Sequence, residues 1–155
     1  MKTTQQMWES KMWPVRNGVY IADGTVALLK VLMPWESVDK RISASVSGSA
    51  MLDQIGEYRE NKLTHLAPLC EQSYADLNLS IFAGEGAHGS EGFVAVSRTT
   101  TGRLMWLAYF DCSNPFEKVL LENDVVIVVS NLGHSWRFPL TQPERLTVDA
   151  GETMT

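Results

Sequence analysis

The glycine-rich segment at residues 84–89, Gly-Glu-Gly-Ala-His-Gly, has the spacing G-x-G-x-x-G and is the most suggestive chemical motif in the chain. In dinucleotide-binding proteins these glycines follow a strand and open a helix, whose N-terminal amides meet the pyrophosphate. Here the following residues, 90–98, are predicted to continue as a strand. We therefore interpret residues 84–92 as a loop between strands and predict no nucleotide cofactor.

Three side chains of this loop, Glu85, His88 and Glu91, are expected to be exposed and available to a ligand or partner. The other two histidines are His65 and His134. None of the three histidines shows the close helical spacing that marks a zinc site, so no metal site is predicted.

Nucleophilic catalysis has equally little support in the sequence. Gly133-His134-Ser135 lacks the second glycine of a G-x-S-x-G elbow. Cys70 and Cys112 have no CxxC partner and are interpreted as buried thiols. Paired carboxylates would need a measured separation, which a sequence does not supply. The sequence therefore favours a protein that is not an enzyme.

The elements that must position these residues are mostly strands. Alternating apolar residues from residue 75 onward predict six of them, over 77–83, 93–98, 103–110, 116–121, 125–130 and 135–140. Short Gly-, Pro-, Asn- and Asp-containing turns join them, so consecutive strands should be antiparallel. We predict an α+β fold, mainly an antiparallel β-meander of about six to eight strands with one or two short helices packed on it.

Earlier in the chain, Asp23-Gly24 predicts the turn of a hairpin over residues 19–33. Apolar residues at helical spacing predict a helix over residues 50–61, which Gly56 weakens by about 1 kcal/mol. Residues 42–50 and 62–74 remain unassigned. The strands at 104–110 and 125–129 are apolar on both faces, so we expect them to be central and covered on both sides.

Five tryptophans are many for a chain of this length. Trp106 and Trp136 fall within predicted strands and are assigned to the core. Trp8, Trp13 and Trp35 lie in less regular segments, where they either cover the open end of the sheet or belong to a partner surface.

The composition is that of one ordinary globular domain. The chain has 155 residues and a mass of 17.3 kDa, with 45% apolar and 20% charged residues and a mean hydropathy of −0.09. We predict a single domain over 1–155, with an N-terminal arm at 1–14 and a peripheral C-terminal tail at 141–155. No membrane span or secretory signal is recognisable, so the expected location is cytoplasmic.

The net charge of −5 is unevenly distributed. Residues 42–155 hold 14 Asp and Glu against seven Lys and Arg. Such an acidic body repels phosphate backbones, so direct nucleic-acid binding is not expected and a basic partner is favoured. The alternative is that the charge serves solubility alone.

The segment at residues 102–117, GRLMWLAYFDCSNPFE, resembles small bacterial immunity proteins. Several of these pair an apolar W-x-x-F/Y-F-D strand with an S-N-P-F turn, and the similarity extends over residues 84–140. Such proteins protect a cell from polymorphic toxins, including those of contact-dependent growth inhibition. The resemblance implies a cytoplasmic protein that neutralises a cognate toxin by stoichiometric binding, with no catalytic residues and no cofactor.

A basic nuclease domain would be the natural target of such an acidic inhibitor. The partner-binding residues are then expected to be exposed groups in loops and at strand edges: Glu85, His88, Glu91, Glu117, Glu122 and Asp124. Two other functions stay open. One is a small ligand-binding or hydrolytic domain with residues 84–92 as a lid. The other is an assembly module that self-associates through a sheet edge or the N-terminal tryptophans.

Overall fold

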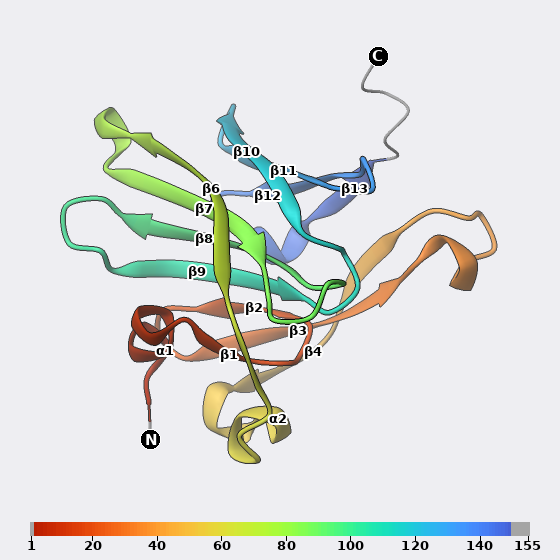
Figure 1. Cartoon of the computed structure of the whole chain (residues 1–155), viewed down its shortest axis with the longest axis horizontal. Coiled ribbons are helices and arrows are strands. Elements are labelled where there is room, and N and C mark those ends of the chain that lie inside the picture. Colours follow the sequence, from red (N-terminus) through yellow and green to blue (C-terminus); the bar gives the residue numbers. More distant parts are fainter. Residues whose placement is uncertain (1, 150–155) are drawn as a thin grey trace.

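The structure is a computed structural model that describes residues 2–149. Two large antiparallel sheets lie face to face, and a two-stranded sheet and two short helices cover the outer face of the larger one (Figure 1). The α+β class with mainly antiparallel sheet is confirmed. The described residues contain thirteen strands divided among three sheets, so the prediction of one meander with fewer strands is wrong.

The seven-stranded sheet joins two local meanders through a single long-range pairing. Strand β2 (Gly18–Ile21) pairs with β9 (Leu104–Phe110), aligning Val19 with Ala108. In spatial order the other strands are β4 (Ser43–Met51) and β3 (Thr25–Leu32) on the β2 side, and β8 (Gly92–Arg98), β7 (Leu79–Glu85) and β6 (Ala67–Tyr74) on the β9 side.

The four-stranded sheet is a simple meander of the C-terminal residues. Its strands are β10 (Phe116–Glu122), β11 (Val125–Ser130), β12 (Ser135–Pro139) and β13 (Thr147–Asp149). It packs on one face of the larger sheet, with β10 against β6 and β7. Between the sheets Phe110 contacts Phe116, Trp136 and Phe138 with ring centroids 4.6–6.3 Å apart, forming the centre of the main core.

The opposite face of the large sheet carries a second core, built from early segments of the chain. These are α1 (Thr4–Ser10), β1 (Met12–Pro14), a 3-10 turn (Leu52–Gln54), α2 (Gly56–Arg59) and β5 (Leu63–His65). Trp8 and Trp13 are buried there, so they cover the sheet. The predicted N-terminal arm is a capped helix followed by a strand that pairs with β5.

The six predicted strands and the hairpin of residues 19–33 are confirmed within one or two residues. The helix predicted over residues 50–61 is shorter, because pairing with β3 keeps the chain extended through Met51 and only the 3-10 turn and α2 follow. The unassigned segments form β4 from 42–50 and β5 and β6 from 62–74.

Strand β9 is buried on both faces, as expected. Strand β11 is buried on its inner face, whereas its outer face has a buried Ile127 between the half-buried Val125 and Val129. Residues 141–149, placed in a peripheral tail by the sequence, form a 3-10 turn (Pro143–Arg145) and β13. Residues 150–155 of that predicted tail lie outside the described residues.

Two further 3-10 turns complete the chain, Pro34–Glu36 between β3 and β4 and Ala75–Leu77 between β6 and β7. Trp106 and Trp136 are buried in the core as predicted. Trp35, at the turn before β4, is 76% exposed and differs in this respect from the other four tryptophans. No helix among residues 2–149 is long and apolar enough to cross a membrane.

Candidate functional site

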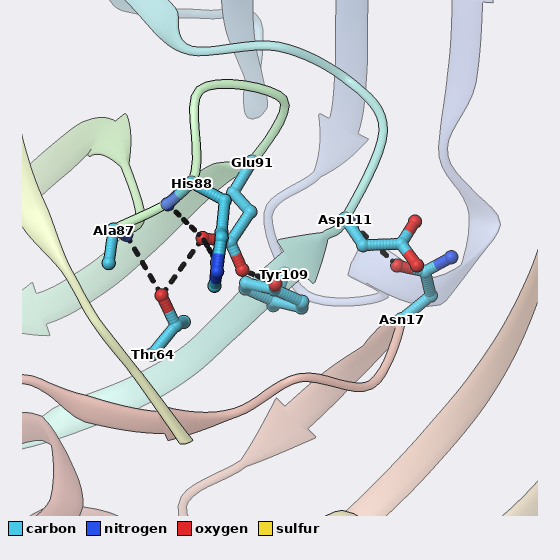
Figure 2. Close-up of polar contacts among 7 residues, drawn as sticks. All are labelled: Asn17, Thr64, Ala87, His88, Glu91, Tyr109 and Asp111. Carbon is cyan, nitrogen blue, oxygen red and sulfur yellow. Dashed lines mark hydrogen bonds and ion pairs between the residues drawn. The ribbon is translucent and has the colours of Figure 1, made fainter. Parts of the chain in front are cut away.

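A buried carboxylate organises the loop between β7 and β8. Glu91, directly before β8, is 2% exposed. Its Oε1 accepts hydrogen bonds from the backbone N–H of His88 at 2.8 Å and from Thr64 Oγ1 at 2.9 Å. Its other oxygen accepts a hydrogen bond from the Tyr109 hydroxyl (Figure 2). The prediction that Glu91 is exposed is therefore wrong, because three donors on separate segments hold it inside.

Thr64 also holds the same loop in place through a hydrogen bond of its own. Its Oγ1, on β5, accepts a hydrogen bond from the Ala87 backbone N–H at 2.9 Å while it donates to Glu91. Space inside the loop is minimal, since a Cβ at Gly86 would lie 2.3 Å from Glu91 Oε1. Only glycine fits at this position, which explains the second glycine of the G-x-G pattern without a nucleotide.

These bonds also set the charges of the cluster. Burial alone would raise the pKa of Glu91, but hydrogen bonds from Tyr109, the His88 backbone and Thr64 outweigh it and hold the pKa below its ordinary value. Burial raises the pKa of Tyr109, and its bond to Glu91 raises it further. The pair therefore consists of an ionised carboxylate and a neutral phenol that donates to it.

His88 is the part of the cluster that faces outward. Its side chain is 74% exposed, while its Nδ1 lies 3.3 Å from Glu91 Oε1. The loop therefore presents an imidazole at the surface on a backbone anchored from below. A positioned histidine of this kind can donate to or accept from a bound group.

An open pocket of about 390 Å³ lies beside this histidine. It is lined by Val15, His88, Ser90, Glu91, Asp111 and Cys112. Asp111 is exposed, and its backbone N–H donates to Asn17 Oδ1 at 2.7 Å, which joins the end of β9 to the segment before β2 (Figure 2). Two acidic residues, the buried Glu91 and the exposed Asp111, are thus among those that line the pocket.

Cys112 does not provide an activated nucleophile in this pocket. Burial, followed by the nearby Asp111 carboxylate, raises the pKa of its thiol to about 12. The thiol is therefore protonated at neutral pH, and only a thiolate is strongly nucleophilic. Both cysteines are free and only partly buried, so the interpretation as buried thiols is confirmed in part.

The structure divides the six predicted partner-binding residues. Glu91 and His88 are in direct contact. Glu85 is half-buried at the end of β7, next to the loop. Glu117 is exposed at the start of β10, where Asn114 N donates to Ser90 O at 2.8 Å and holds the β9–β10 connection against the loop.

Glu122 and Asp124 are also exposed, but they lie at or just beyond the opposite end of β10. At about 3.3 Å per residue they are roughly 20 Å from the start of that strand. The predicted residues therefore form one group near the loop and a separate pair at the β10–β11 turn.

Sequence reasoning missed Thr64, Tyr109 and Asp111. Tyr109 carries the one available signal, because a tyrosine inside an apolar strand needs a partner for its hydroxyl. Thr64 lies in a segment without a clear period, and it is 27 residues from Glu91. Its role depends on the pairing of β5 with β1, which local sequence does not reveal.

Among residues 2–149, no group of three or more His, Cys, Asp or Glu side chains is placed to hold a metal ion. His65 is exposed on β5, and His134 is half-buried in the β11–β12 turn. No protein-family model matches the chain, and a search of curated proteins finds no similar sequence. The site is therefore interpreted from its own geometry.

Proposed function

We propose that this chain is an immunity protein that binds a basic bacterial toxin domain and neutralises it by covering its substrate groove. The observation that carries the proposal is the anchored loop at residues 86–91, which displays His88 beside an open acidic pocket. A surface that is ordered before binding loses little conformational entropy in a complex. The acidic net charge of −5 and the resemblance of residues 102–117 support the same function.

The pocket suits a basic side chain. An arginine of the partner would pair with the exposed Asp111, while the ionised, buried Glu91 nearby would attract it without direct contact. A guanidinium matches the geometry of a carboxylate, and such charge-assisted hydrogen bonds are stronger than those between neutral groups. Glu85 and Glu117, beside the loop, would contact basic groups outside the pocket. Glu122 and Asp124, farther away, would contribute chiefly by attracting the partner over a distance.

The test is protection in bacteria that express the toxin domain encoded beside this chain's gene, followed by calorimetric titration of the purified pair. We expect rescue of growth and a one-to-one complex of nanomolar affinity that weakens as salt is raised. A gene surrounded only by metabolic enzymes, or the absence of both rescue and binding, would contradict the proposal.

Matched variants locate the contact. Asp111→Asn and Asp76→Asn each remove one exposed negative charge, but only Asp111 lines the pocket. We expect about 10- to 100-fold weaker binding for Asp111→Asn, as for an interface hot spot. Asp76→Asn should stay within about twofold of the parent. Equal effects of the two variants would show that net charge, rather than this pocket, determines affinity.

A second candidate, a small ligand-binding or hydrolytic domain, is favoured by the pocket itself. The hydrogen bonds at Ala87 and His88 oppose opening of residues 84–92 as a lid, and the protonated Cys112 disfavours hydrolysis. Of these, binding of a small organic cation is the activity that the exposed carboxylate of Asp111 supports. Saturable binding of agmatine that Asp111→Asn abolishes, without rescue from any toxin, would favour this candidate.

A further inference from the structure

Strand β4 forms one edge of the seven-stranded sheet and pairs only with β3 among the described strands. It extends over nine residues, Ser43–Met51. On its free side, alternate backbone N–H and C=O groups have no strand to bond, which makes the edge a template for another strand. Val46 in its middle is 49% exposed.

The other edges of the two large sheets carry prolines or charges or are very short, all of which discourage pairing, whereas β4 carries only one bulge, between Val46 and Gly48. Strand β6 contains Pro68 beside a bulge. Strand β10 carries charged residues, and its Leu121 N–H is already bonded to the Tyr74 hydroxyl at 2.8 Å. Strand β13 is only three residues long. No charged residue or proline occurs anywhere over residues 42–52.

The charges that flank β4 indicate what pairs with it. Lys40 and Arg41 precede the strand, Asp53 follows it, and all three side chains are exposed. In an antiparallel pairing of two β4 strands, the basic end of each lies beside the acidic end of the other. This complementarity occurs twice around a two-fold axis, whereas parallel pairing would place like charges together.

The bulge in β4 also permits such a pairing without reversing the faces of the sheet. The register shifts between Leu28 and Leu29 of β3. As a result Val46, opposite Leu29, and Ser49, opposite Ala27, both lie on the face of the main core. If Val46 of one copy pairs with Ser49 of the other, both faces continue across the junction and Arg41 lies next to Asp53 of the second copy.

We propose that β4 is a self-association edge, through which two copies of this chain pair antiparallel to form one continuous sheet. Val46 then loses exposure at a junction of small side chains, and the two copies share ion pairs at both ends of the paired strands. The loop at residues 86–91 belongs to a different connection, between β7 and β8, so this dimer is independent of the function proposed above.

Sedimentation equilibrium of the purified full-length chain, from about 1 to 200 μM, tests the proposal. We expect a monomer–dimer equilibrium, with mass approaching twice 17.3 kDa at high concentration. A mass that stays monomeric throughout this range would overturn the proposal.

A charge swap at the paired positions tests the register. In the double variant Val46→Lys/Ser49→Lys, the lysine at position 46 of each copy faces the lysine at position 49 of the other. Dimerisation should therefore weaken at least tenfold. In the double variant Val46→Lys/Ser49→Glu, each lysine faces a glutamate of the other copy, so dimerisation should be restored. Because both positions are exposed, both variants should keep the parent's unfolding temperature at concentrations low enough for the parent to be monomeric. Unchanged dimerisation in the first variant, or failure of the second to restore it in a folded protein, would overturn this pairing.

Discussion

At the scale of single residues, the buried Glu91 makes stability depend on acidity. Its pKa is held below the ordinary value of 4.5 in the folded chain. The stability it contributes is therefore fully present above the pKa of the unfolded chain and is lost as pH falls through the lower, folded value. Acid would break its bonds to Tyr109, Thr64 and the loop together.

Glu91→Gln tests this dependence. An amide cannot accept on both of its ends, so one of the buried donors loses its partner and unfolding at pH 7 should become about 1–3 kcal/mol easier. The difference from the parent should shrink as pH falls below the ordinary value of 4.5 and through the lower folded pKa, because the parent then loses its carboxylate bonds. Urea unfolding at several pH values measures this. Glu117→Gln, at an exposed position, is the control, and an equal effect there would contradict the account.

The sequence could indicate which residue types lay in the loop, but it could not indicate their burial. His88 and Glu91 are neighbours in sequence and remain neighbours in space. The sequence predicts a surface position for Glu91, because a glutamate without a visible partner normally lies there. Its partners Tyr109 and Thr64 are 18 and 27 residues away, and only the fold brings them together.

At the scale of elements, two glycines of one loop have different roles. A Cβ at Gly86 would lie 2.3 Å from Glu91 Oε1 and 2.9 Å from Thr64 Oγ1, whereas a Cβ at Gly89 would meet nothing within 4 Å. The loop is therefore tightly packed at its start and open at its outer end, although both positions look alike in the motif.

Gly86→Ala should accordingly destabilise the chain by about 1–3 kcal/mol, since the carboxylate must move away from its donors. Gly89→Ala should change stability by less than about 0.5 kcal/mol. Thermal unfolding of the two variants provides the comparison. If Gly89→Ala proved as harmful as Gly86→Ala, loss of glycine flexibility, rather than the Glu91 contact, would be responsible.

Most strands were predictable because their turns are clearly marked. Asn123 and Asp124, with φ of 51° and 60°, form the β10–β11 turn, and Gly102 and Gly133 also adopt positive φ. These residue types tolerate positive φ, so they mark the positions of turns in the sequence. The sequence does not predict strand β4, because its small residues lack the alternation of apolar and polar side chains that marks a strand.

At the scale of the whole molecule, stability depends on the contact between the two large sheets. Phe110 is fully buried there and contacts three other aromatic rings. Phe110→Ala should reduce the free energy of unfolding by about 3–5 kcal/mol. Phe82→Ala, at a half-buried position beside Trp8 on the other face, should cost less. Chemical denaturation of both variants measures the two losses in the free energy of unfolding. Equal losses would contradict the central role of the Phe110 cluster.

The arrangement of the sheets was less predictable than the strands themselves. Short turns correctly indicated local meanders, but β2–β9 and β1–β5 pair residues far apart in the sequence. Nothing in a local pattern records such pairings. The division into two stacked sheets therefore emerged only from the structure, as did the second core beneath the N-terminal segments.

The junction of β2 with β9 also bears on how the chain acquires this structure. Val19 must meet Ala108 across 88 intervening residues, whereas the strands on either side of the junction pair mainly with sequence neighbours. Closing so long a loop is entropically costly before any contact compensates for it. During synthesis the early meander must wait until β9 leaves the ribosome, so the rate-limiting event should be late docking of two preformed halves.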